Sequence, residues 1–458
     1  MENACSVLSG NLPSRQKRDI PKDNLSGYAG AVIREFDILN ERYGGIFGSN
    51  AISLYFGGGT PSLMAADFFE RIIGYINKNF SFSSGAEITV EVNPESGDYA
   101  KFRALKDMGV NRISIGAQSF NDEVLKFAGR VHAGRDISKC YENARKVGFD
   151  NISLDIIMGL PKQSLDILDS DLTAVKGLDP EHISAYMLSI EKGTVFYDQL
   201  KKLAEFKPPE KISDVNRNIN ENKCIECIDG DYSNFYKRNS RCLSNIYNSN
   251  SFDENLRNGN LLDDKFDDDD KIAEYFIRCA EFLTGNDYDH YEISNFAKKK
   301  RQSRHNLTYW QRGEYIGLGP SASSFLRLSP DAEIRKTNVA DLELYLGRIS
   351  NYEEPVGYIE TLTKKDMINE EIFLSLRTAL GIKKKRLAEI TRQDVVKDLI
   401  KHGFLSLSDS KNDSSNLETD PLRRKRKKNY IPICQEKSVI LTLKGMMVSN
   451  EIFVKLLK

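Results

Sequence analysis

Three glycines followed by Thr60 and Pro61 come directly after the apolar run Ile52–Phe56, which predicts a strand. Residues without a Cβ therefore stand at the carboxyl end of a strand, where α/β folds bind their ligands. Because glycine lets backbone groups approach a ligand closely, Gly58, Gly59 and Thr60 are candidate contacts. A tight turn that binds nothing is the alternative interpretation.

Later predicted strands also carry polar side chains at or near their ends: Glu91 in Glu87–Val92, Gln118 after Arg112–Ala117, and Asp155 in Ile152–Met158. Such side chains can hold ribose hydroxyls or an α-ammonium group. Arg130 follows Gln118 by twelve residues, and its guanidinium can bind a carboxylate through two hydrogen bonds. Each group alone could be a satisfied ion pair at a strand end. Together, in this chain order, they favour a site for a zwitterionic nucleoside.

The elements that must position these groups follow a repeating pattern. From Tyr28 to about Leu203, short apolar runs alternate with amphipathic stretches, which predicts βα units and a parallel sheet. A further strand is expected at His182–Leu188. Asp67–Asn79 and Asp136–Val147 carry apolar residues three and four apart, as helices lying on a sheet do. The expected fold class is α/β, a partial (β/α) barrel.

The remaining chain divides by composition. Residues 207–270 are rich in Asn, Asp, Ser and Lys, so they bury too little apolar surface to offset their ordering entropy and are expected to form an inserted loop. A helix at Ile272–Leu283 and a strand at Tyr288–Phe296 are expected next. The predicted organisation is an atypical or truncated N-terminus (1–27), a barrel core (28–206), the insert (207–270), a barrel continuation (271–360) and a small, mostly helical C-terminal domain (361–458) with an insert at 408–428.

Composition excludes several classes of protein. The chain has 458 residues and a formal charge of -1, so no overall field favours nucleic acid or an anionic membrane. No run of 18 apolar residues predicts a transmembrane helix, although peripheral membrane association is left open. The seven cysteines are scattered, which is typical of a reducing compartment and favours the cytoplasm. Arg15, Lys17 and Arg18 keep a mitochondrial location as the alternative.

The motif series resembles the radical S-adenosylmethionine (SAM) core of oxygen-independent coproporphyrinogen III oxidase and its relatives. The segments that carry the resemblance are Gly57–Pro61, Glu91–Pro94, Asn111–Phe120, Gly129–His132 and Asp155–Gln163. It covers roughly residues 24–205 and 271–458, and it implies a C-terminal domain of the HemN type. By this resemblance, the residues that contact SAM are Gly58, Gly59, Thr60, Glu91, Gln118, Arg130 and Asp155.

Within that family, the segment Arg304–Trp310 resembles the HNxxYW signature of the HemW group of heme chaperones, and Tyr291–Ala297 agrees with it. The resemblance implies that His305, Tyr309 and Trp310 bind heme. An imidazole can ligate heme iron, and neighbouring aromatic rings can wall the macrocycle. A structural histidine beside aromatic residues is the alternative. The implied partners are heme and heme-accepting proteins such as respiratory cytochromes, and no nucleic acid.

The N-terminus departs from the family. Radical SAM proteins hold a 4Fe–4S cluster with a CxxxCxxC loop after the first barrel strand, whereas residues 1–27 contain only Cys5, a candidate remnant ligand. Either the chain begins inside that loop and the first strand is lost upstream, or its start is unrelated sequence. Cys224, Cys227 and Cys242 fall in the 207–270 insert. They are expected to be incidental thiols, with a metal site as the alternative.

The leading hypothesis is a HemW-like heme chaperone that binds heme and SAM and transfers heme to acceptor proteins. One alternative is an oxygen-independent coproporphyrinogen III oxidase, a radical SAM enzyme of heme biosynthesis. Another is an inactive, degenerate radical SAM barrel. The HNxxYW segment and the short stretch before Tyr28 favour the chaperone, whereas the missing cysteines favour the inactive barrel.

Overall fold

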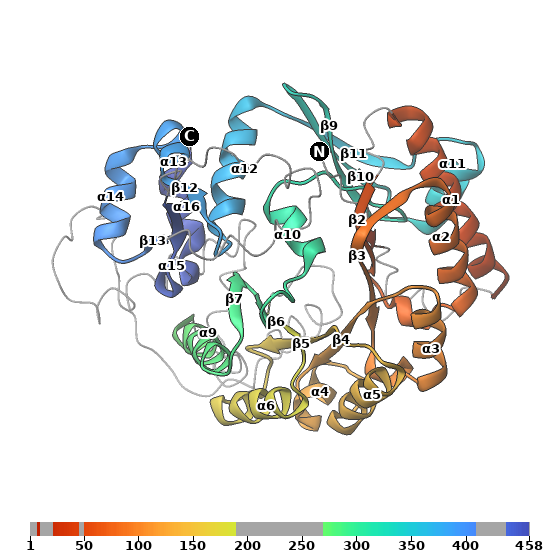
Figure 1. The fold of residues 1–458 in the computed structure, drawn as a ribbon, viewed down its shortest axis with the longest axis horizontal. Helices are drawn as coiled ribbons and strands as arrows, with labels where there is room; N and C mark the ends of the chain where they lie inside the picture. The colour runs from red at the N-terminus through yellow and green to blue at the C-terminus, as the bar shows by residue number, and fades with distance from the viewer. Residues whose placement is uncertain (1–6, 10–21, 45–49, 189–268, 409–436, 458) are drawn as a thin grey trace, which may run out of the picture.

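A curled eight-stranded sheet forms the centre of the computed structural model, which describes residues 7–9, 22–44, 50–188, 269–408 and 437–457. Its strands, in spatial order, are β1 (Val7–Ser9), β2 (Asn50–Gly57), β3 (Ser81–Val92), β4 (Arg112–Gln118), β5 (Ile152–Met158), β6 (His182–Met187), β8 (Asn295–Ala297) and β7 (Asp289–Glu292). Strands β1 to β6 are parallel, and β8 and β7 add an antiparallel edge. Figure 1 shows this sheet bending into an incomplete barrel, which confirms the expected fold class.

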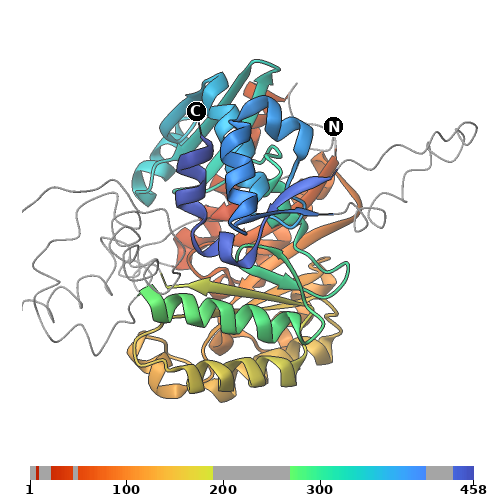
Figure 2. The same ribbon diagram turned by 90° about the vertical axis from the view of Figure 1, so that its left-hand side faces the viewer.

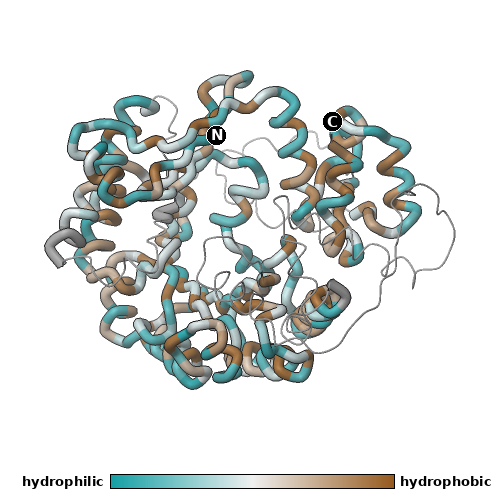
Figure 3. Tube along the Cα trace, turned by 180° about the vertical axis from the view of Figure 1, so that it is seen from behind, coloured by the Kyte–Doolittle hydropathy of each residue, from teal (hydrophilic) through white to brown (hydrophobic). Residues whose placement is uncertain are grey.

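Helices cover the convex face of the sheet (Figures 1 and 2). They are α1 (Lys22–Tyr43), α2 (Ala66–Asn79), α3 (Tyr99–Asp107), α4 (Asp122–Phe127), α5 (Gly134–Val147), α6 (Leu165–Leu178) and α9 (Asp269–Thr284). Along them, hydrophobic and hydrophilic residues alternate in the way that one buried face requires (Figure 3). The buried faces and the outward side chains of the strands share one apolar core, in which Phe69, Ile113 and Leu154 are fully buried. This core leaves the concave face of the sheet free for polar residues.

The strand expected at Tyr288–Phe296 is two strands. β7 and β8 form a tight antiparallel hairpin, and β8 pairs with β6. The Glu292 carboxylate accepts the backbone N–H of Ser294 at 3.0 Å and also bonds the Asn295 side chain, so this short polar turn is stabilised locally. The polar residues Glu292, Ser294 and Asn295 mark this turn in the sequence, and the prediction of one continuous strand was wrong because it passed over them.

The rest of the described chain forms two smaller units. A three-stranded antiparallel sheet of β9 (Ser323–Ser329), β10 (Ala332–Asn338) and β11 (Val356–Leu362) accompanies α11 (Leu342–Ser350). Residues 271–360 therefore continue the large sheet only in part. The C-terminal unit comprises α12 (Lys364–Leu376), β12 (Ile382–Lys383), α13 (Lys384–Ile390), α14 (Gln393–Lys401), β13 (Leu405–Ser408), β14 (Ser438–Leu441), α15 (Leu443–Met447) and α16 (Ser449–Leu456).

Most of the two expected inserts, residues 207–268 and 409–428, lies outside the described residues. α9 begins at Asp269, so the last two residues of the 207–270 segment are helical. None of the helices in the described ranges combines the length and the apolar character that crossing a bilayer demands. α10 (Arg304–Trp310) lies on the concave side of the large sheet, close to β2 (Figure 1).

Candidate functional site

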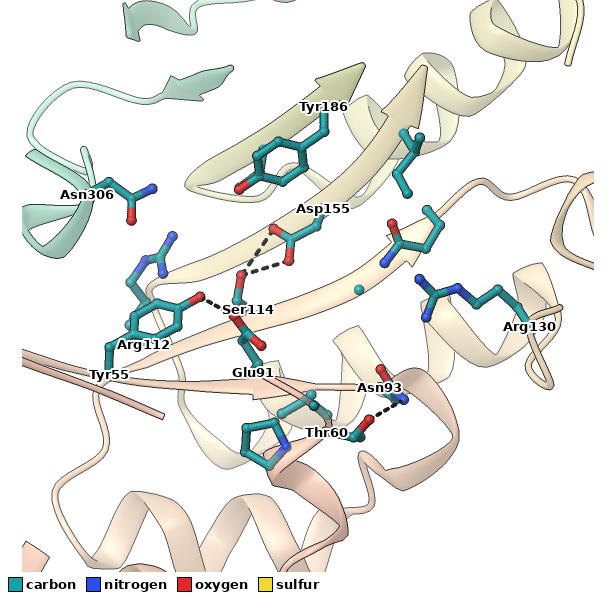
Figure 4. A pocket seen from close by; sticks show the side chains of 17 residues that line it. Tyr55, Thr60, Glu91, Asn93, Arg112, Ser114, Arg130, Asp155, Tyr186 and Asn306 are labelled. Carbon is teal, nitrogen blue, oxygen red and sulfur yellow. Dashed lines mark hydrogen bonds between the residues drawn. The ribbon is translucent and has the colours of Figure 1, made fainter. Parts of the chain in front are cut away.

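A pocket of about 300 Å³ lies on the concave face of the sheet, towards the carboxyl ends of β2 to β6 (Figure 4). This volume is at the lower end of the range for small-molecule sites. Its lining residues are Tyr55, Gly59, Thr60, Pro61, Glu91, Val92, Asn93, Arg112, Ser114, Gly116, Gln118, Arg130, Asp155, Ile157, Ser184, Tyr186 and Asn306. Six of the seven residues expected to bind SAM are among them. The seventh, Gly58, is not in the lining, but its backbone N–H donates to Glu91, which is.

The pocket follows the alternation of side chains along each strand. On β4, Arg112, Ser114, Gly116 and Gln118 line the pocket, whereas the residues between them are buried on the opposite face. Because successive residues of a strand point to opposite faces, this spacing of two is the geometric signature of an inward-facing row. Prediction from strand ends alone missed Tyr55, Arg112, Ser114, Ser184, Tyr186 and Asn306. For the strand residues among them, this alternation is the signal that identifies them.

Glu91 is held from two sides. The Tyr55 hydroxyl donates to its Oε1 at 2.7 Å, and the backbone N–H of Gly58 donates to its Oε2 at 3.1 Å. Burial raises the pKa of the Glu91 carboxyl, while the Tyr55 hydrogen bond opposes that rise. A Cβ on Gly57 would lie 2.4 Å from the Tyr55 ring and 2.8 Å from Glu91 Oε1. The first glycine is therefore required to leave room for this pair.

Asp155 is the second carboxylate of the pocket. The Ser114 hydroxyl lies 3.1 Å from both of its oxygens, and the Ser153 hydroxyl lies 3.2 Å from Oδ1. Burial raises the pKa of Asp155, and hydrogen bonds from Ser184 and Ser114 and the charge of Arg112 counteract it. These serine hydroxyls therefore hold the Asp155 carboxylate in one orientation without a ligand.

Gln118 and Arg130 complete the polar lining of the pocket. Gln118 ends β4 with φ of 67°, a left-handed conformation that is uncommon outside glycine. Arg130 follows Gly129, whose φ is 71°, and burial lowers the pKa of its guanidinium. With Glu91 and Asp155, Arg130 provides groups of both signs in one cavity. Such a set can bind a ligand that carries both an ammonium and a carboxylate.

α10, which carries the HNxxYW segment, is anchored on the sheet by Glu87 of β3. The Glu87 carboxylate accepts the Ser303 hydroxyl and the backbone N–H groups of Arg304 and His305, each at 3.2 Å. These donors belong to the first turn of the helix, where backbone N–H groups have no partner within the helix and a negative charge is favoured. The contact joins residues more than 200 positions apart in the chain and places Asn306 at the pocket.

His305 is buried with only 4% of its surface exposed. Its Nδ1 lies 3.1 Å from the Ser53 hydroxyl and its Nε2 lies 2.9 Å from the Tyr309 hydroxyl. Its ring stacks on Tyr55 with the centroids 4.6 Å apart. Burial and the Arg112 charge lower the pKa of His305 to about 3, so the imidazole is neutral. Both ring nitrogens have protein partners in this arrangement.

Trp310 lies apart from the pocket. Its indole N–H donates to Glu292, and the Arg377 guanidinium lies 6.0 Å from its ring centroid. The three residues expected to bind heme are thus brought together on α10, but His305 and Tyr309 contact each other and Trp310 faces other partners. Heme binding by this set stays a prediction.

The described residues do not fit a 4Fe–4S cluster. Within the described ranges no three His, Cys, Asp or Glu side chains gather at one point, and Cys140 and Cys279 are buried with thiol pKa values raised to about 12. Cys5, Cys224, Cys227 and Cys242 lie outside the described residues. β1 pairs in parallel with β2 at one edge of the large sheet.

Comparisons with known proteins identify the family of the chain. The model of the radical SAM superfamily matches residues 43–173. The chain is 29% identical to the heme chaperone HemW of Bacillus subtilis over 88% of this chain and 84% of that protein, and 31% identical to HemW of Lactococcus lactis over 72% and 70%.

The crystal structure of coproporphyrinogen III oxidase (HemN) from Escherichia coli aligns with a TM-score of 0.63 at 18% identity, covering 99% of this chain and 90% of that one. This likeness shows a shared fold. Taken with the motif series and the pocket that it builds, the sequence relationships place the chain in the heme chaperone HemW family of radical SAM proteins.

Proposed function

We propose that this protein is a heme chaperone, which binds heme and SAM and passes heme to acceptor proteins such as respiratory cytochromes. The observation that carries the proposal is the position of the HNxxYW helix. Asn306 lines the candidate SAM pocket, and His305 stacks on Tyr55, whose hydroxyl bonds Glu91. Movement of the HNxxYW helix would therefore alter the lining of the pocket. Coupling between two ligands requires such a connection between their sites.

In the proposed SAM site, Arg130 binds the methionyl carboxylate, and Glu91 and Asp155 bind the ammonium and the ribose hydroxyls. Gly58, Gly59 and Thr60 let the ligand approach the backbone beside β2, and Gln118 adds an amide. SAM bound to a cluster supplies a 5′-deoxyadenosyl radical in this superfamily. The described residues provide no cluster ligands, so the roles proposed for them concern the binding of SAM alone.

The test is a set of binding and transfer measurements on the full chain. Heme titration followed by the Soret band and SAM titration by calorimetry should each saturate near one equivalent, and heme-loaded protein should convert an apocytochrome into its heme form. No Soret shift and no transfer would refute the proposal. Conversion of coproporphyrinogen III under anaerobic conditions with SAM would instead favour the oxidase. The cytoplasm is the proposed location and the mitochondrion the alternative, to be decided by cell fractionation.

A further inference from the structure

Arg112 is a buried cation that faces the pocket and lacks a matched anion. Its residue is 2% exposed, and among the described residues its Nε has no hydrogen-bond partner and no carboxylate forms an ion pair with its guanidinium. Burial disfavours the charge of Arg112, but nearby acidic groups, Glu87 first, outweigh it and raise the pKa of the guanidinium. Arg112 therefore stays charged without a direct ion pair, and its N–H groups face the cavity.

The acidic groups that act on Arg112 already have other partners. Glu87 receives three donors from Ser303 and the first turn of α10, and Asp155 receives the hydroxyls of Ser114 and Ser153. These carboxylates supply a favourable field at a distance, but neither forms a two-bond contact with the guanidinium. Arg112 therefore keeps donors for a ligand.

Histidines near Arg112 supply no anion either. His182 lies between the Ser153 hydroxyl at 2.8 Å and the Tyr291 hydroxyl at 2.8 Å, and His305 lies between Ser53 and Tyr309. Both rings are buried. These two neutral rings flank the Arg112 guanidinium, so an anion can reach it only from the pocket.

Arg112 and Arg130 lie at opposite ends of the pocket. Figure 4 shows Arg112 beside Tyr55 and Asn306 at one end, and Arg130 near Asn93 and Thr60 at the other. Of the expected SAM contacts, Thr60 lies near Arg130, and Glu91 and Asp155 lie between the two arginines, so Arg112 stands beyond them on the far side. A second ligand could therefore approach Arg112 while SAM is bound.

The charges of the pocket favour an anion at that end. Its charged lining residues are two acids, Glu91 and Asp155, and two arginines. SAM brings an ammonium, a sulfonium and a carboxylate, so its binding leaves an excess of positive charge. A carboxylate at Arg112 would balance it.

We propose that Arg112 and Asn306 form a subsite for a carboxylate arm of a second ligand. On the function proposed above, on which this inference rests, that arm is a propionate of heme. A cavity of about 300 Å³ is at the lower limit for a small ligand, so the macrocycle lies outside it and only the slender propionate enters. The guanidinium binds the carboxylate through two hydrogen bonds, and the Asn306 amide adds a donor.

The experiment compares hemin with hemin dimethyl ester, in which both carboxylates are blocked, by Soret titration of the full chain with SAM present. Wild-type protein should bind hemin about tenfold or more tightly than the ester. R112Q should bind the two equally, R112K should keep part of the preference, and N306A should reduce it. Circular dichroism establishes that each variant is folded. R135A, at an exposed position outside the pocket, is the matched arginine control and should keep the full preference.

The outcomes separate the two proposals. Equal binding of hemin and ester by wild-type protein, or an undiminished preference in folded R112Q, overturns the subsite while heme binding stands. If R112Q does not fold, an unchanged preference in N306A overturns it instead. No binding of either porphyrin by wild-type protein refutes the heme function itself, and the assignment of the arm to a propionate falls with it.

Discussion

Replacement of His305 by alanine distinguishes a buried structural imidazole from an exposed iron ligand. The change removes the contacts to Ser53 and Tyr309 and the stack on Tyr55. Ser53 is fully buried, so losing its partner costs about 1–3 kcal/mol, and the half-buried Tyr309 hydroxyl adds about 1 kcal/mol. Loss of the ring stack adds roughly 1 kcal/mol. We expect His305→Ala to lower the free energy of unfolding by about 3–5 kcal/mol.

The pH dependence provides a second signature. The folded-state pKa of His305 is about 3, below the usual value of about 6.5. Between these two pH values His305 is protonated in the unfolded chain and neutral in the folded chain. The contribution of His305 to stability is therefore fully present above pH ~6.5 and is lost as the pH falls towards 3. Because linkage amounts to about 1.4 kcal/mol per pH unit, wild-type protein should lose about 1 kcal/mol more than His305→Gln between pH 6 and pH 5.

Urea unfolding followed by circular dichroism measures both quantities. His402→Ala is the matched control, because the His402 side chain is exposed and its imidazole lies against Asp398 on the preceding turn of α14. Its unfolding free energy should stay within about 0.5 kcal/mol of wild type. A His305→Ala variant that is destabilised by less than about 1 kcal/mol would show that the imidazole is not held between these partners. That result would favour the interpretation of His305 as a ligand of heme iron.

The remaining predictions concern the pocket and its surroundings. Arg130→Ala should weaken SAM binding about tenfold to hundredfold in calorimetry, because a charge-assisted contact is lost, and equal affinity would remove Arg130 from the site. Tyr55→Phe should raise the pKa of Glu91 further and shift the pH profile of SAM affinity upward, and an unshifted profile would contradict the role of the hydroxyl. Trp310→Phe removes a donor to Glu292, whose pKa burial raises to about 7. A carboxyl with a raised folded-state pKa loses stability as the pH rises, so this variant should lose more stability relative to wild type at pH 8 than at pH 6 in urea unfolding, and a constant difference would be evidence against the contact.

The five parallel strands β2 to β6 were predictable from the sequence because each contains a short apolar run, whereas β1 and the β7–β8 hairpin were not predicted. Ile152–Met158 was predicted with the bounds that β5 has. Of the pocket, groups such as Glu91 and Arg130 were predicted, whereas Arg112 was missed because it stands at the start of β4 and the prediction considered only the strand ends. Contacts such as Glu87 with the start of α10 depend on tertiary docking, which local patterns do not record.

Because Glu87 anchors α10 on the large sheet, the pocket is complete only when this helix is docked. One wall comes from β2 to β6 and the other includes Asn306, from a segment beyond residue 268. A ligand that contacts both walls binds only the form in which α10 is docked. Such a ligand stabilises the docked helix more strongly as its concentration rises above its dissociation constant. Amide exchange in α10 should therefore slow when the pocket is filled. Filling of the pocket by a ligand and docking of the HNxxYW helix are therefore thermodynamically coupled.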